Sequence, residues 1–257
     1  MIDTHCHLTD PHLLPQIEQV MSRAAAAGVT HMVTIGTGPP EWEPCLRVCR
    51  QFPNVRCALG VHPNYCDEVE KAALLELRSL QADPMVVALG EMGLDYHYDD
   101  VPKAKQLDYF QSQLAMAVEF NRPVVIHSRK SMNDCLAAMK DFALADAVFH
   151  CFSGSMDEAR RVIDAGYYIG FTGVVTFKKC EELRQIAQWA PASRILVETD
   201  APYLSPEPMR KQKICEPALV VHTAAIVAAA RGVSTAEIDH LTSENAMRFY
   251  RWNKTGG

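Results

Sequence analysis

Histidine and carboxylate side chains recur directly after short apolar runs in this sequence. The runs are rich in Val, Ile or aromatic residues, and the ionisable residues that follow them are His5, His7, His62, Glu91, His127, His150 and Asp200. Any one of them has an ordinary interpretation as a hydrogen-bonded histidine, a helix cap or a turn residue. Buried strands seldom acquire such residues at their ends by chance, so the repeated position indicates a common site.

Imidazole nitrogens and carboxylate oxygens are metal ligands. This mixture suits Zn²⁺, Mn²⁺ or Fe²⁺, whereas Mg²⁺ prefers more oxygen. Four histidines and two carboxylates exceed the needs of one tetrahedral ion, so we expect two divalent ions, with Zn, Mn and Mg as candidates. Two ions about 3.5–4 Å apart can activate a water and stabilise both oxygens of an in-line displacement. We expect Glu91 to bridge the ions and Asp200 to orient the water and accept its proton.

The apolar runs predict eight short strands separated by helices. The predicted strands are residues 2–4, 31–35, 55–61, 86–90, 124–126, 148–149, 167–172 and 195–198. Apolar residues on three-and-four spacing predict helices around residues 13–24, 107–120, 159–163 and 183–187. Gly28 and Gly166 mark two helix ends, each just before a strand. Units of about 32 residues have the size of the repeat in a (β/α)₈ barrel.

We therefore predict an α/β fold, a (β/α)₈ TIM barrel of the metal-dependent hydrolase type, as a single domain over residues 1–257. In such a barrel the carboxyl ends of the strands converge on one mouth, which explains the shared position of the ionisable residues. The alternative is a doubly wound open sheet. The strand count favours the barrel, and no GxGxxG motif follows the first strand.

Composition excludes several classes of protein. The 257 residues are 48% hydrophobic and 22% charged, which is sufficient for a large core and not typical of disorder. No apolar run reaches the roughly 18 residues of a spanning helix, and the first residues, MIDTHCHLTD, do not look like a signal peptide. Nine scattered cysteines predict reduced thiols. We expect a cytoplasmic protein with no membrane contact and no obligate protein partner.

Seven segments resemble the TatD family of metal-dependent hydrolases, a branch of the amidohydrolase-like barrels. They read DTHCHL, GVHP, GEMGLDY, IHSR, FHCFSG, YYIGFTG and ETDAPYL, in order from Asp3 to Leu204. The resemblance implies a TatD-related deoxyribonuclease that acts on DNA or another phosphodiester, often in the 3′→5′ direction on single strands. Some relatives instead resemble deacylases that act on aminoacyl-tRNA.

The resemblance also implies roles for individual residues. One metal ion would be held by His5, His7, Glu91 and Asp200, and the other by Glu91, His127 and His150. His62 and Arg129 would contact a substrate phosphate, with Tyr96 near the site.

Two positions depart from the family pattern. Asn64 stands in GVHPN where the family often has histidine, and Cys215 stands where an asparagine usually precedes Glu216 and Pro217. Both changes are expected to alter contacts with substrate and to leave the metal ligands intact.

Basic residues gather in the loops after the fifth, seventh and eighth predicted strands. They are Arg129, Lys130, Lys178, Lys179, Arg210, Lys211 and Lys213, seven of the 25 lysines and arginines. On a chain of net charge −6 these loops would form a local positive surface for phosphates. The expected substrate contacts in these loops are therefore Lys178, Lys179, Arg210 and Lys213. The resemblance adds Glu216, beside His62, Arg129 and Tyr96. Nearby aromatic residues (Tyr65, Tyr96, Tyr98, Phe177 and Tyr203) could stack on bases.

Three functions are compatible with this pattern. The leading hypothesis is a divalent-metal-dependent deoxyribonuclease that uses a metal-activated water. The first alternative keeps the metal centre and hydrolyses an ester or amide, such as an aminoacyl-tRNA linkage. The second is a non-catalytic barrel that binds nucleic acid, which the complete ligand set disfavours.

Overall fold

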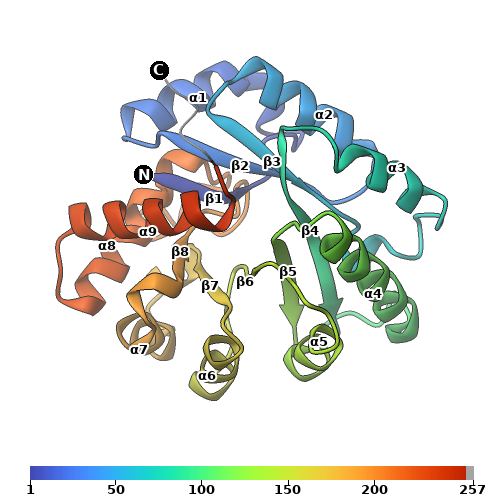
Figure 1. Ribbon diagram of the computed structural model, residues 1–257. Coiled ribbons are helices and arrows are strands. Elements are labelled where there is room, and N and C mark those ends of the chain that lie inside the picture. Colours follow the sequence, from blue (N-terminus) through green and yellow to red (C-terminus); the bar gives the residue numbers. More distant parts are fainter. Residues whose placement is uncertain (253–257) are drawn as a thin grey trace. The chain divides into compact units, whose positions relative to one another are not determined.

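Strands and helices alternate along the computed structural model, which describes residues 1–252 (Figure 1). The strands are β1 (Ile2–Cys6), β2 (His31–Gly36), β3 (Val55–Leu59), β4 (Val86–Asp95), β5 (Val124–Arg129), β6 (Ala147–Phe149), β7 (Tyr168–Phe171) and β8 (Ile195–Val197). The helices are α1 (Ile17–Ala26), α2 (Pro39–Gln51), α3 (Ala73–Leu80), α4 (Lys103–Glu119), α5 (Met132–Met139), α6 (Met156–Asp164), α7 (Glu181–Trp189), α8 (Val220–Arg231) and α9 (Thr235–Phe249). All eight predicted strands are present, and the four predicted helical segments correspond to α1, α4, α6 and α7.

The strands are hydrogen-bonded in chain order, from β1 to β8. The pairs β3 with β4, β4 with β5, β5 with β6, and β7 with β8 are parallel. Parallel neighbours that are consecutive in the chain require a crossover connection, usually a helix, and a helix lies between every two consecutive strands. The fold class is therefore α/β of the (β/α)₈ TIM-barrel type, as predicted.

The described chain divides into two compact units. The central unit is Thr34–His150, and the terminal unit comprises Met1–Val33 with the described part of Cys151–Gly257. Each unit has its own fully buried aromatic side chains, such as Trp42 in the central unit and Tyr168 in the terminal unit. The single domain expected over residues 1–257 stays a prediction.

Helices of the central unit fix the strand ends that carry ionisable residues. Figure 1 shows α4 beside β4. The side-chain amide of Gln113 in α4 accepts a hydrogen bond from the backbone nitrogen of Val61 (2.8 Å) and donates one to its carbonyl (3.1 Å). The indole nitrogen of Trp42 in α2 donates to the carbonyl of Gly60 at 3.0 Å. These contacts hold the segment after β3 that leads to His62.

Strand β4 is longer than predicted. The sequence predicted that it ends at Gly90, with Glu91 after it, whereas Glu91 lies inside the strand. Between Leu89 and Met92, β4 has one more residue than the facing part of β5, which is a β-bulge. Gly90 and Gly93 have φ angles of 136° and 148°, which only glycine adopts readily. The predicted end was wrong because a bulge flanked by glycines resembles a turn in the sequence.

Among the helices of residues 1–252, none alone combines the length and apolar character of a membrane crossing. Two consecutive segments, Pro217–Arg231 and Thr235–Phe249, are long and apolar enough for a crossing only when taken together. The chain bends by 108° between them.

Gly93→Ala is expected to destabilise the protein strongly. An added Cβ would overlap the carbonyl oxygen of His127 in the neighbouring strand, at a φ that L-residues avoid. We expect the free energy of unfolding, measured by urea denaturation, to fall by about 3 kcal/mol or more. The control is Gly28→Ala, since Gly28 also has a positive φ (83°) but no atom lies within 4 Å of its added Cβ. There the expected loss is about 1 kcal/mol, and equal losses in both variants would contradict the close approach.

Candidate functional site

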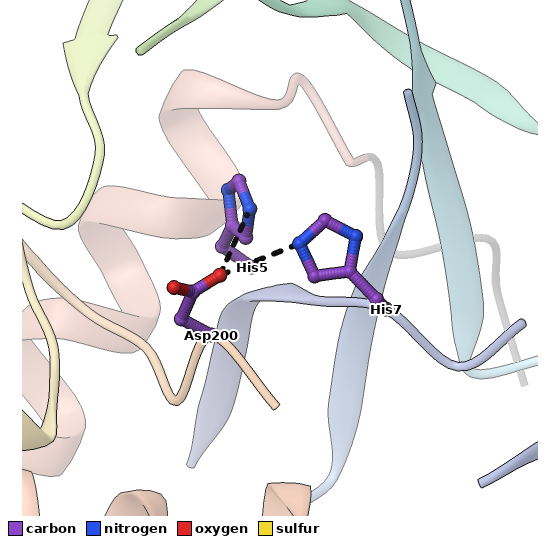
Figure 2. A group of neighbouring side chains, drawn as sticks. All are labelled: His5, His7 and Asp200. Carbon is purple, nitrogen blue, oxygen red and sulfur yellow. Dashed lines mark ion pairs between the residues drawn. The ribbon is translucent and has the colours of Figure 1, made fainter. Parts of the chain in front are cut away.

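Two histidines and an aspartate form a cluster in the terminal unit. His5 lies in β1, His7 follows that strand, and Asp200 follows β8. Figure 2 shows both imidazoles turned toward one carboxylate: Nε2 of His5 and Nε2 of His7 lie 3.6 and 3.3 Å from Oδ1 of Asp200. One ligand atom from each residue lies within 4.8 Å of the other two. The structure therefore brings these three predicted ligands together.

Backbone hydrogen bonds hold this cluster in place. The amide nitrogen of Asp200 donates to the carbonyl of His5 at 2.9 Å, and that of His7 donates to the carbonyl of Ala201 at 2.7 Å. The φ of Asp200 is 61°, a left-handed value that aspartate tolerates better than most residues. The main chain itself thus directs the carboxylate toward both histidines.

Asp3 is a buried carboxylate that the sequence reasoning did not assign to the site. It accepts hydrogen bonds from the amide nitrogen (2.9 Å) and hydroxyl (2.6 Å) of Thr199, and from the amide nitrogen of His5 (3.4 Å). Burial raises the pKa of Asp3 to about 8, although the hydrogen bonds from Thr199 oppose that shift. Asp3 and His5 are two residues apart in the sequence and so lie on the same face of β1. That spacing could have identified Asp3 from the sequence.

Glu198 is a second buried carboxylate beside the cluster that was missed. It accepts hydrogen bonds from the amide nitrogen of Cys151 (2.6 Å) and the hydroxyl of Thr4 (3.2 Å). A Cβ at Gly170 in β7 would lie 2.8 Å from both carboxylate oxygens of Glu198. Glycine at that position therefore gives the buried carboxylate its space.

A second cluster, in the central unit, surrounds Glu91. Its Oε1 atom lies 2.6 Å from Nε2 of His150, 2.8 Å from Nδ1 of His127 and 3.5 Å from Nε2 of His62. The side chain of Glu91 is almost fully buried. Four predicted site residues, carried by four successive strands or the segments after them, thus meet around one carboxylate.

Burial and the imidazoles act in opposite directions on the pKa values of this cluster. Burial raises the pKa of Glu91, but His150, His62 and His127 hold it well below its usual range. Burial also lowers the pKa of His62. For His127, burial lowers the pKa, but hydrogen bonds to Asp95 and Glu91 outweigh it and raise the pKa to about 9. At pH 7 the cluster therefore combines an ionised Glu91, a protonated His127 and a neutral His62.

Asp95 is a further site residue that the sequence reasoning missed. Its Oδ2 lies 3.1 Å from Nε2 of His127, while Nδ1 of the same ring faces Glu91. The side-chain amide of Gln106 fixes the backbone of Asp95 through two hydrogen bonds, of 2.8 and 2.9 Å. Metal-binding histidines commonly donate their other ring N–H to a carboxylate. Asp95 lies in GEMGLDY with Glu91, and that shared segment was the available signal.

Both clusters fit a divalent metal ion in their donor chemistry. The terminal-unit cluster offers two imidazoles and a carboxylate, and the cluster around Glu91 offers three imidazoles and a carboxylate. His62, Glu91 and His127 have ligand atoms within 4.8 Å of one another. Nitrogen and oxygen donors in these proportions are typical of Zn²⁺ and related transition metals.

Arg129 and Tyr96, predicted near the substrate, lie together in the central unit. The backbone nitrogen of Tyr96 donates to the carbonyl of Arg129 at 2.9 Å. The Tyr96 hydroxyl donates to Asp134 at 2.9 Å, and the ammonium of Lys103 lies 4.2 Å from its ring centroid. Arg129 is exposed, with its guanidinium 5.3 Å from the ring centroid of Tyr98. Tyr96 is thus engaged by protein groups, whereas Arg129 remains accessible to a ligand.

The predicted cations of the terminal unit lie in two loops that we name the basic loops. They follow β7 and β8 and carry the exposed residues Lys178, Lys179, Arg210, Lys211 and Lys213. The loops contact each other, because the amide nitrogen of Glu207 donates to the hydroxyl of Thr176 at 2.8 Å. The guanidinium carbon of Arg210 also lies 3.4 Å from the ring centroid of Phe177.

Glu216, a predicted substrate contact, forms an ion pair in the structure. Its carboxylate accepts hydrogen bonds from Nε (2.6 Å) and Nη2 (2.9 Å) of Arg23 in α1. The preceding residue, Cys215, is fully buried, and the expected effect of this departure on substrate contacts stays a prediction. The role of Glu216 toward substrate stays a prediction.

Comparisons with known proteins identify the family of this chain. The family model described as TatD related DNase matches residues 2–251. The uncharacterized metal-dependent hydrolase YabD of Bacillus subtilis (strain 168) is 35% identical over 256 residues, which cover 98% of this chain and 100% of that protein. A Klebsiella pneumoniae (strain 342) protein named 3′-5′ ssDNA/RNA exonuclease TatD is 34% identical over 256 residues, 97% of each chain.

A solved structure extends the similarity to three dimensions. The crystal structure of YJJV, a TatD homologue from Escherichia coli K12, matches with a TM-score of 0.93 and 28% identity over 98% of each chain. Because the family model matches nearly the whole of this chain, the chain belongs to the TatD-related DNase family, as its motifs predicted.

Proposed function

We propose that this protein is a divalent-metal-dependent phosphodiesterase that removes nucleotides from the 3′ ends of single-stranded DNA. The observation that carries the proposal is the presence of two histidine–carboxylate clusters, around Asp200 and around Glu91. The exonuclease name of the Klebsiella pneumoniae relative supports the substrate class. Family membership supports hydrolysis.

We assign one divalent ion to each cluster. The proposed ligands are His5, His7 and Asp200 for one ion, and Glu91, His127 and His150 for the other. When bound, such ions supply Lewis acidity toward phosphodiester oxygens and lower the pKa of water. The nitrogen-rich donor set favours Zn²⁺ or Mn²⁺ over Mg²⁺.

We assign to Asp200 the role of the base that accepts the proton of the attacking water. Its Oδ1 faces both histidines, and a carboxylate can coordinate through one oxygen while it accepts a proton at the other. The side chain retains 13% of its exposure, so water can reach it. The hydrogen bonds of Asp3 to Thr199 and His5 hold the main chain on both sides of this cluster.

We propose that His62 and Arg129 donate hydrogen bonds to the phosphate oxygens of the substrate. The amide nitrogen of Asn64 donates to Nδ1 of His62 at 3.1 Å, so the ring proton lies on Nε2, and His62 acts there as a hydrogen-bond donor. A ring nitrogen that carries a proton has no lone pair for a metal ion, but it can donate a hydrogen bond to a phosphate oxygen. The exposed guanidinium of Arg129 can bind a phosphate through two parallel hydrogen bonds.

Nuclease activity is expected to depend on both clusters. Purified protein with Mg²⁺, Mn²⁺ or Zn²⁺ should release nucleotides from 3′-labelled single-stranded DNA and leave a parallel panel of carboxylic esters intact. Asp200→Asn, which preserves the left-handed backbone preference, and Glu91→Gln should each lower kcat by about 100-fold or more. Glu244→Gln, an exposed carboxylate of α9, is the control and should have no effect.

Other outcomes of that assay would select the alternatives. Turnover of esters without nucleotide release would replace the nuclease by an ester or amide hydrolase. DNA binding without turnover of any substrate, under all three metals, would indicate a non-catalytic barrel.

Metal binding at pH 7 is expected to release a proton from His127. Its raised pKa of about 9 means that the ring is protonated below that pH, whereas a metal ligand must be neutral. Isothermal titration calorimetry in buffers of different ionisation enthalpy should detect about one proton released at pH 7 and about half a proton at pH 9.

The variant Asp95→Asn tests whether Asp95 causes the raised pKa of His127 and the release of its proton on metal binding. Loss of the carboxylate should lower the pKa of His127, reduce the proton count and weaken metal affinity by about 10–100-fold. Asp108→Asn removes a half-exposed carboxylate of α4 and should change neither quantity. Identical titrations for wild type and Asp95→Asn would show that Asp95 does not orient the ligand.

The basic loops are expected to bind the phosphate backbone. Replacement of Lys178, Lys179 and Lys213 by alanine should reduce the slope of log affinity against log salt by about 2, since each contact to a single strand contributes about 0.7. Fluorescence anisotropy of labelled DNA across a sodium chloride series measures the slope. The control is a triple variant of exposed residues to alanine: Arg47 in α2, Lys140 just after α5 and Arg160 in α6. A slope unchanged in the loop variant would mean that the loops do not meet phosphates.

A further inference from the structure

Tyr203 places an exposed aromatic ring against the terminal-unit cluster. Its side chain is 55% exposed. The ring meets the imidazole of His7 edge to face, with centroids 5.9 Å apart and planes inclined by 70°. His7 in turn faces the carboxylate of Asp200 at 3.3 Å. A ligand at this cluster would therefore have the tyrosine ring beside it.

Hydrogen bonds fix the main chain that carries this ring. The amide nitrogen of Tyr203 donates to the carbonyl of Asp200 at 2.9 Å, and the amide nitrogen of Cys215 donates to the carbonyl of Pro202 at 2.9 Å. Asp200 and Leu204, on either side, have φ angles of 61° and 56°. A ring held on such a turn loses little conformational entropy when a ligand stacks on it.

The basic loops join the segment that follows Tyr203. A Cβ on Gly173, at the start of the loop after β7, would collide with the carbonyl oxygen of Leu204. The same two loops share the hydrogen bond from Glu207 to Thr176. Tyr203 and the lysines and arginines of the basic loops are therefore carried on segments that pack directly on each other.

We propose that Tyr203 stacks on a nucleobase that flanks the scissile phosphodiester, an inference that rests on the proposed nuclease function. Proteins that bind single strands combine a basic groove with aromatic rings on which bases stack, and such stacking tolerates any base. Tyr203 and the basic loops supply both parts. Tyr203 thereby gives the site a preference for nucleotides over phosphodiesters that lack a base.

Two other aromatic side chains of the terminal unit fit this role less well. The guanidinium of Arg210 already covers the ring of Phe177 at 3.4 Å. Trp189 is 39% exposed but ends α7, just before the amino end of β8, whereas the cluster follows the carboxyl end of that strand. Trp189 therefore provides a control for the loss of an exposed aromatic ring.

The first test compares wild type, Tyr203→Phe and Tyr203→Ala on two substrates. One is a single-stranded oligonucleotide, and the other is the same DNA with abasic sugars at the last two positions. Tyr203→Ala should raise KM about tenfold on the normal DNA, with kcat unchanged, and should have no effect on the abasic DNA. Tyr203→Phe keeps the ring and should behave as wild type on both. An equal effect of Tyr203→Ala on the two substrates would overturn the proposal.

The second test detects stacking without turnover. A phosphorothioate-linked oligonucleotide with 2-aminopurine at its last two positions should lose fluorescence when it binds wild type, Tyr203→Phe or Trp189→Ala. Binding to Tyr203→Ala should leave most of the fluorescence, and equal quenching by that variant would refute the stacking. Failure of wild type to cleave any DNA would contradict the nuclease function instead, and the quenching measurement would still decide the role of Tyr203.

Discussion

The ionised carboxylate of Glu91 is the constraint on which the site depends. A carboxylate that is 3% exposed costs several kcal/mol to bury as an ion unless opposite charge or hydrogen bonds surround it. Imidazole nitrogens at 2.6, 2.8 and 3.5 Å supply that compensation. Protons on the imidazoles and a divalent cation are alternative sources of the same positive charge. The charge of Glu91 therefore holds the imidazoles of His150 and His127 around it.

In the terminal unit, the charges of the carboxylates are compensated in a different way. Asp200 keeps 13% of its exposure, so solvent partly compensates its charge. The fully buried carboxyl groups beside it, Asp3 and Glu198, are surrounded by N–H and O–H donors. A pKa of about 8 for Asp3 also limits the negative charge near the cluster at neutral pH. Buried groups thus position the main chain, while the carboxylate of Asp200 stays accessible to solvent.

The fold and the grouping of the histidines and carboxylates could be predicted because both depend on local pattern. Each strand is a short apolar run, and each of these residues lies within three residues of such a run, so position alone brought them together. Asp3, Glu198 and Asp95 could not be assigned because their roles depend on partners such as Thr199, Cys151 and His127 that only the folded chain brings near. The bulge that places Glu91 inside β4 depends on the facing register of β5. The ion pair of Glu216 with Arg23 joins positions 193 apart in sequence, which no local pattern reveals.

The exposed cations of the basic loops and Tyr203 lie outside the strands. They are carried on segments held together by contacts such as Glu207 to Thr176, whereas the histidines and carboxylates of the two clusters lie in strands or just after them. Cys215 is buried, and its backbone amide donates to the carbonyl of Pro202, so the segment around Cys215 supports the turn that carries Tyr203. A chain of net charge −6 can still bind a polyanion, because the charge next to the bound phosphates, and not the net charge, determines their electrostatic attraction.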